Sequence, residues 1–181
     1  MKALIAAMLV LVIICNACLF AQEAGPIDKG SLIIGGSASF TSSKAEGSST
    51  RVTGISLRPS LLYFFFPSVA IGGNIHIQNT SAGYYEASAF SIGPKVAFFF
   101  RTKSDNLYPY LGASFNITSA DDYTATELRL SGGLAALVVS HVAITGEFFY
   151  QLEHYDPDSE YYSAYNLNTF GVTFGITAFI Y

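Results

Sequence analysis

The chain has 181 residues and a formal net charge of −4, with 51% hydrophobic and only 12% charged residues. This balance offers no basic patch for nucleic acid, so we expect no nucleic-acid partner. The composition includes 15 Phe and 12 Tyr, yet after the first 21 residues no apolar run is long enough for a spanning helix. Such a composition is expected when apolar residues alternate along strands that face lipid.

The first residues have the parts of a secretory signal peptide. Lys2 precedes an apolar run from Ala3 to Ile14, and the small residue Ala21 stands before the polar Gln22. We predict a signal peptide over 1–21 that is cleaved after Ala21, and therefore a protein that crosses the inner membrane of a bacterium.

Two other interpretations of this leader stay open. The run could be a permanent anchor, although it is shorter than the roughly 20 residues of a spanning helix, or Cys18 could carry a lipid. Because Cys15 and Cys18 both lie in the leader, the remaining chain has no disulfide framework. We expect a short periplasmic segment over 22–29 and a single domain over 30–181.

Eight segments bounded by Gly, Ser, Asn, Asp and Pro alternate between apolar residues and small or polar ones, as β-strands do. They lie at about 31–41, 51–64, 69–79, 88–101, 108–118, 125–138, 141–153 and 168–181. In the last segment Phe170, Val172, Phe174 and Ile176 alternate with small residues from Thr169 to Gly175. Successive side chains of a strand point to opposite faces, so each strand has one apolar face.

The character of the second face decides which face lies inside. A soluble barrel or sandwich would need many charged residues on its polar face. Here that face consists mostly of Gly, Ser, Thr and Ala with isolated charges. Small residues suit the interior of a narrow barrel, which leaves the bulky face for hydrocarbon. We predict an all-β, eight-stranded antiparallel up-and-down transmembrane β-barrel, with a soluble ligand-binding barrel of the lipocalin type as the alternative.

The connections between the predicted strands agree with this topology. If the N-terminus is periplasmic, the periplasmic turns are 65–68, 102–107 and 139–140, and all of them are fairly short. The connection over 155–167 is the longest and faces the cell exterior in this arrangement. Short periplasmic turns and longer outer loops are typical of outer-membrane barrels.

Two stretches resemble a known family. The sequence LRPSLLYFFFPSVAIGGNIHI from Leu57 to Ile77, and the run Ser91–Lys95 followed by Phe98–Phe100, are similar to the porin-family outer-membrane β-barrel domain of Bacteroidetes-like bacteria. The resemblance covers about residues 30–181 and implies an outer-membrane location and an eight-stranded barrel. It also implies that the C-terminal strand, which ends in the aromatic Tyr181, is recognised by the barrel assembly machinery.

Isolated charges lie on the predicted inner face of several strands. A charge near mid-membrane is costly in lipid and costly when buried alone, so opposite charges must meet inside. We predict a structural network in the lumen made by Arg58, Lys95, Arg129, Glu147, Asn74, His76, Asn116 and Gln151. A selectivity filter or proton-linked gate is the alternative for these residues.

Other chemistry has weaker support in the sequence. His154, with Ser159 and Ser163 nearby, could belong to a lipid-modifying triad, but no nucleophile motif surrounds the serines. The acidic residues from Asp156 to Glu160 lack the glycine and distal Glu of a calcium loop. We predict no catalytic residue, no cofactor and no metal.

The predicted protein is therefore a non-enzymatic, monomeric outer-membrane barrel. Its partners are membrane lipid and, through the 155–167 loop, molecules outside the cell. The alternatives are a narrow channel for small solutes and a lipid-modifying enzyme. Pro59 and Pro94, on the outward face, are expected to mark a bulge or bend.

Overall fold

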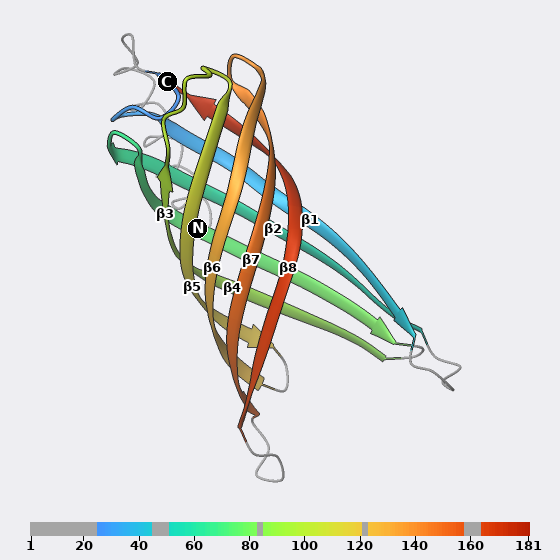
Figure 1. Ribbon diagram of the computed structural model, residues 1–181. Coiled ribbons are helices and arrows are strands. Elements are labelled where there is room, and N and C mark those ends of the chain that lie inside the picture. Colours follow the sequence, from blue (N-terminus) through green and yellow to red (C-terminus); the bar gives the residue numbers. More distant parts are fainter. Residues whose placement is uncertain (1–24, 45–50, 83–84, 121–122, 158–163) are drawn as a thin grey trace, which may run out of the picture.

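The computed structural model describes residues 25–44, 51–82, 85–120, 123–157 and 164–181. The predicted signal peptide over 1–21 lies outside these residues, as do Ser159 and Ser163. Eight antiparallel strands pair in chain order and close into one barrel (Figure 1). They are β1 (Leu32–Lys44), β2 (Arg51–Phe66), β3 (Val69–Ala82), β4 (Tyr85–Phe99), β5 (Leu107–Ala120), β6 (Tyr123–Val139), β7 (Val142–Pro157) and β8 (Tyr165–Ile180). Over the described ranges, the structure has no helix with the length and apolar character to cross a membrane.

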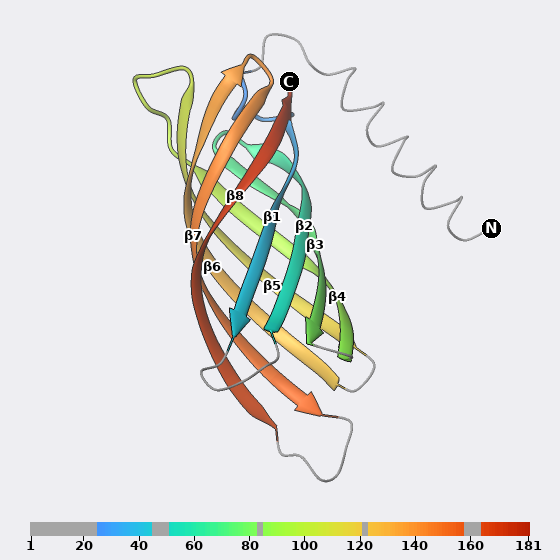
Figure 2. The same ribbon diagram turned by 90° about the vertical axis from the view of Figure 1, so that its right-hand side faces the viewer.

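The predicted fold class is confirmed, with strands that are longer than expected. Each strand has between 13 and 17 residues, whereas about 9 to 11 suffice for a tilted span. Most of the extra residues lie at the end of the barrel where β2, β4, β6 and β8 begin, which we call the long-loop end; the opposite end is the short-turn end. At the long-loop end the hairpins continue through polar sequence (Figure 2). Pairing there needs only backbone hydrogen bonds, so it does not require an apolar face.

The predicted assignment of faces is confirmed as well. The large residues of the apolar parity are exposed on the outside of the barrel, as in Ile144 on β7 and Phe174 on β8. Residues of the opposite parity, such as Glu127 and Arg129 on β6, are buried inside. A soluble barrel would have the reverse arrangement, so the soluble alternative does not fit this structure.

The two prolines do not produce bulges. At Pro59 and at Pro94, pairing with one neighbouring strand stops for two residues and then resumes in the same register. The expectation of a bulge is therefore wrong, because proline removes one N–H donor without adding a residue. The register shifts lie instead between Phe64 and Phe66 and between Leu137 and Val139, next to two short turns.

The barrel interior differs from the prediction at the short-turn end. Large apolar side chains, among them Phe64, Phe99 and Phe179, pack there instead of glycines and hydroxyls. The rings of Phe64 and Phe99 lie 5.4 Å apart between centroids, and those of Phe99 and Tyr110 lie 5.2 Å apart. We call Ile27, Ile33, Leu62, Phe64, Phe99, Tyr110 and Phe179 the aromatic plug.

The segment before β1 covers this end of the barrel. Ile27 inserts into the aromatic plug and is almost fully buried. The Gly30 N–H donates to the Phe64 carbonyl at 2.9 Å, and the Ser68 N–H donates to the Ile27 carbonyl at 2.8 Å. Asp28 forms an ion pair with Arg101. The segment is therefore attached to β2, to the β2–β3 turn and to the residues after β4.

Candidate functional site

The centre of the lumen holds a buried ion pair that spans the barrel. Arg58 on β2 donates from Nη1 and Nη2 to the two carboxylate oxygens of Glu127 on β6, at 2.6 and 3.1 Å. Asn116 Nδ2 donates to the same carboxylate at 2.7 Å, and Arg58 Nη2 lies 2.9 Å from His76 Nδ1. Glu127 is only 1% exposed. A two-point contact with further hydrogen bonds is the arrangement in which a buried charge is best compensated.

A second ion pair lies beside the first. Arg129 Nη2 donates to Glu147 Oε1 at 2.7 Å, and Arg129 Nη1 donates to Gln151 Oε1 at 3.4 Å. The Tyr110 hydroxyl donates to Glu147 Oε2 at 3.1 Å, and the Arg129 guanidinium carbon lies 3.6 Å from the centre of the Phe149 ring. Tyr110 thereby links this pair to the aromatic plug, and the face of Phe149 adds a cation–π contact.

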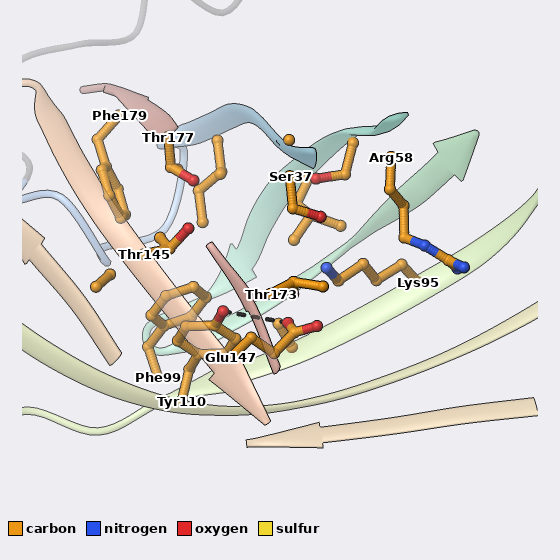
Figure 3. Close-up of a pocket in the computed structure, with 16 residues that line it drawn as sticks. Ser37, Arg58, Lys95, Phe99, Tyr110, Thr145, Glu147, Thr173, Thr177 and Phe179 are labelled. Atoms are coloured by element: carbon orange, nitrogen blue, oxygen red, sulfur yellow. Dashed lines mark hydrogen bonds between the residues drawn. The ribbon is translucent and has the colours of Figure 1, made fainter. Parts of the chain in front are cut away.

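The structure joins six of the eight predicted lumenal residues by direct contacts: Arg58, His76, Asn116, Arg129, Glu147 and Gln151. Lys95 lines a small cavity together with Glu147, and its side chain extends into that cavity (Figure 3). Asn74 is buried inside, but neither polar atom of its amide has a partner among the described residues. Asn74 therefore does not belong to the network, and Lys95 lies at its border.

Glu127 is the lumenal residue that the predicted network lacks. Its inward parity and its position two residues before Arg129 are visible in the sequence. Its main partner, Arg58, lies on β2, which pairs with β1 and β3 and not with β6. The contact crosses the lumen, so neither sequence spacing nor strand neighbours indicate it.

Two cavities lie on either side of the ion pairs. The cavity toward the aromatic plug measures about 60 Å³ and is lined by Lys95, Tyr110 and Glu147 among others. The cavity toward the long-loop end measures about 140 Å³ and is lined by His76, Gln78 and Gln151 among others. Arg58 borders both. At roughly 30 Å³ per water, each holds only a few waters, and Ser37, Arg58 and Thr173 line both.

The histidines do not form a triad with serine in the described parts of the chain. His154 Nδ1 lies 2.8 Å from the amide oxygen of Asn166. His141 is in the turn before β7, and its Nδ1 atom lies 3.2 Å from the carbonyl oxygen of Phe179. The described residues include no group of His, Cys, Asp and Glu suited to hold a metal ion.

Asp28, which lies outside the spanning strands, has a lowered pKa. The Gly25 N–H donates to its Oδ2 at 2.7 Å, and Arg101 pairs with its other oxygen. Both contacts stabilise the carboxylate, so the pKa of Asp28 lies below its ordinary value of 3.8. The negative charge of Asp28 is thus part of the attachment of the N-terminal segment.

Comparison with solved structures defines the class of protein. The Neisserial surface protein A (NspA) superposes with a TM-score of 0.58 at 20% identity, over 83% of this chain and 97% of that one. The outer membrane protein OprG from Pseudomonas aeruginosa (TM-score 0.49, 14% identity, 86% of this chain and 99% of that one) is also similar. The superposition on NspA, together with the closed sheet of eight strands, shows that the chain has the fold of the eight-stranded outer-membrane β-barrels.

This likeness confirms the predicted resemblance at the level of the fold. A bacterial group such as the Bacteroidetes stays a prediction. No protein-family model matches the chain, and no curated protein matches it.

Proposed function

We propose that the protein is a non-enzymatic barrel of the bacterial outer membrane. Its closed lumen makes it a rigid anchor, and its loops act at the cell surface. The apolar outward face supports placement in a bilayer, since a β-barrel is one of the two structures that satisfy their backbone groups in lipid. The predicted signal peptide and the shared fold support the outer membrane in particular.

The observation that carries the proposal is the closure of the lumen at two levels. The aromatic plug, with Ile27 inserted from the N-terminal segment, fills the short-turn end. Above it, the Arg58–Glu127 and Arg129–Glu147 pairs fill the middle. An eight-stranded barrel is just wide enough for its own side chains, and the side chains at these two levels therefore support a lumen that is closed to solutes.

Conductance in planar bilayers tests this proposal. We expect the refolded wild-type barrel to give no unitary current where a general porin gives steady steps. The double variant Arg58→Ser/Glu127→Ser removes one of the two ion pairs of the middle level and keeps the aromatic plug, so it should also stay silent. Steady unitary steps from the wild-type barrel would contradict the proposal and favour the narrow channel, for which the two cavities are the supporting observation.

Location is tested separately by cell fractionation and gel mobility. The protein should appear in the outer-membrane fraction, and it should migrate faster in SDS without boiling than after boiling. Recovery in the buffer-soluble fraction would contradict the membrane placement. The enzyme alternative predicts that His154→Ala changes the lipid profile of the outer membrane, and we expect no change.

Two partner interactions belong to the same proposal. The buried Phe179 and the Tyr181 hydroxyl, which donates to the Ser140 carbonyl at 2.6 Å, fasten the end of β8 to the barrel. We propose that the assembly machinery recognises this strand before it closes, so deletion of Tyr181 should lower the amount of folded barrel in cells. We also propose that the 155–167 loop makes the contacts outside the cell and that the barrel is monomeric.

A further inference from the structure

The hairpin of β7 and β8 continues beyond the apolar band of the barrel at the long-loop end. On β8 the exposed outward residues change from Phe170, which is 87% exposed, to Asn168 and Asn166. On β7 they change at the same level, from Leu152, which pairs with Asn168, to His154. Apolar outward residues suit lipid and polar ones suit water. The hairpin therefore projects into water above the pair Leu152↔Asn168 (Figure 2).

One edge of this projection has no neighbouring strand in the described parts of the chain. β1 pairs with β8 only from Leu32↔Ile180 to Ala38↔Phe174, and the earlier part of β8 pairs with β7 alone. Figure 1 shows β1 diverging from β8 toward the long loops. We call the part of β8 from Tyr165 to Asn168 the open edge. Its backbone N–H and C=O groups on this side are a template for one more strand.

The open edge lacks the features that protect exposed strands from pairing. Such features are charged side chains, prolines and β-bulges. The strand from Tyr165 to Ile180 contains no charged residue and no proline, and its register with β7 has no shift. The free part of β1, by contrast, ends at Lys44. The edge of β8 is therefore the one of the two that favours addition of a strand.

A column of tyrosine rings ends at the open edge. Tyr123 on β6, Tyr155 on β7 and Tyr165 on β8 have the inward parity of their strands. The ring centroids of Tyr123 and Tyr155 lie 5.2 Å apart, and those of Tyr155 and Tyr165 lie 4.9 Å apart with nearly parallel planes. Tyr165 is 53% exposed. A strand added at the edge brings its own side chain beside Tyr165, where an aromatic ring extends the column.

The charge near the open edge has one sign. After Arg129 the sequence contains no Lys or Arg, whereas four acidic residues lie in β7 and the connection to β8: Glu153, Asp156, Asp158 and Glu160. No Lys or Arg of the described ranges forms an ion pair with Glu153. Complementary charge steers association and suppresses wrong partners. This end of the barrel therefore favours a basic partner.

We propose that the open edge binds an extended basic segment of another protein by strand addition. The segment pairs antiparallel with β8, places an aromatic side chain on Tyr165 and brings Lys or Arg near the acidic residues. In this mode the backbone hydrogen bonds provide affinity and alternate side chains provide specificity. A second copy of the chain fits less well, because its own acidic end is repelled. The inference rests on the outside contacts proposed for the 155–167 loop and names the class of partner.

Binding of a short peptide to the full-length barrel in phosphatidylcholine nanodiscs tests the site. The probe is fluorescent acetyl-TKTYTKT-amide, which carries Lys and Tyr on one face of a strand, and the readout is fluorescence anisotropy. A control peptide with Glu for both Lys should bind at least about tenfold more weakly, because it is repelled by the acidic end.

Two N-methylated versions of the probe separate strand addition from charge attraction. One is methylated at the backbone nitrogens of Lys and Tyr, and the other at those of Thr. Alternate N–H groups of an added strand point toward β8, so only one version blocks the pairing. That version should bind at least about tenfold more weakly, and the other should bind like the probe. The amides 165–168 should gain protection from hydrogen exchange when the probe binds.

Two matched pairs of variants locate the peptide. Tyr165→Ala removes the ring at the open edge and should weaken binding about threefold to tenfold, whereas Tyr123→Ala removes the ring at the far end of the column and should have little effect. Asp156→Asn should weaken binding about threefold, and Asp105→Asn, at the short-turn end, should leave it unchanged. Folding of every variant is checked by unboiled gel mobility.

Several results would overturn the site. One is equal binding of the two N-methylated peptides, and another is an equal effect of Tyr165→Ala and Tyr123→Ala. Concentration-dependent dimers with protected amides 165–168 would show that a second copy occupies the edge. The surface placement has its own test, since Ala164→Cys should react with an impermeant maleimide on intact cells. Absence of that reaction would contradict the proposed function, whereas the peptide assays on the purified barrel decide the site itself.

Discussion

Replacing Glu127 by Gln should destabilise the barrel more than any other change of a single charge in the lumen. The substitution keeps the size of the side chain and leaves the Arg58 guanidinium buried without its counter-ion. Two charge centres about 4 Å apart attract by ~4 kcal/mol at an effective dielectric constant of 20. Breaking a buried pair from one side costs about 3–5 kcal/mol in measured cases. We expect the free energy of unfolding to fall by about this amount.

The assay is urea unfolding of the refolded barrel in detergent, with the folded fraction read from unboiled gels. The matched control is Glu153→Gln on β7, since Glu153 accepts a hydrogen bond from the Tyr155 hydroxyl at 3.1 Å. Because the Gln amide oxygen can still accept this hydrogen bond, the control should cost about 1 kcal/mol at most.

The double variant Arg58→Leu/Glu127→Leu removes both charges and should return to within roughly 1–2 kcal/mol of the wild type. If Glu127→Gln unfolds like Glu153→Gln, the Arg58–Glu127 pair does not stabilise the barrel and the reasoning is wrong.

Three further predictions concern the faces, the N-terminal segment and one turn. Ile144→Lys places a charge on the lipid face, and Thr145→Lys places it on the lumenal face. Ile144→Lys should lower the yield of folded barrel more, because Lys costs about 2–4 kcal/mol at the bilayer midplane. Equal yields would contradict the assignment of faces. The ion pair of Asp28 with Arg101 should attach the N-terminal segment fully above pH 3.8 and lose its contribution as the pH falls through the lowered folded-state pKa of Asp28. Relative to the intrinsic exchange rate at each pH, the protection of the segment's amides from hydrogen exchange should therefore fall below pH 3.8, and Asp28→Asn should remove this loss of protection. Ser68 has a φ of 70°, so Ser68→Gly should raise the free energy of unfolding by about 1 kcal/mol, and a lower urea midpoint would argue against strain in this turn.

Much of the fold could be predicted from sequence because a strand repeats its side-chain direction every two residues. In β8 the alternation of Phe170, Val172 and Phe174 with small residues determined the strand and its outward face. The scarcity of charge on the other face then favoured a lipid-facing barrel over a water-facing one. Both properties belong to a single strand and are visible in a short stretch of residues.

The alternation fails where both faces of a strand are apolar. In the stretch from Leu61 to Phe66, the side chains on both faces of the strand are apolar. The alternation therefore does not reveal that Leu62 and Phe64 enter the aromatic plug. The continuous apolar runs at 61–66 and 96–100 were the available signal for a second apolar compartment inside the barrel.

The partners inside the lumen were decided only by the closed structure. Parity places Arg58 and Glu127 inside, but they meet across the cylinder and belong to strands that do not pair. The same holds for the pairing of β1 with β8, which extends only from Leu32↔Ile180 to Ala38↔Phe174, since the point where the two strands separate depends on how they tilt when the sheet closes. Where only one face of a strand is apolar, the sequence by itself determined which way each side chain points, and closure of the sheet determined what it meets there.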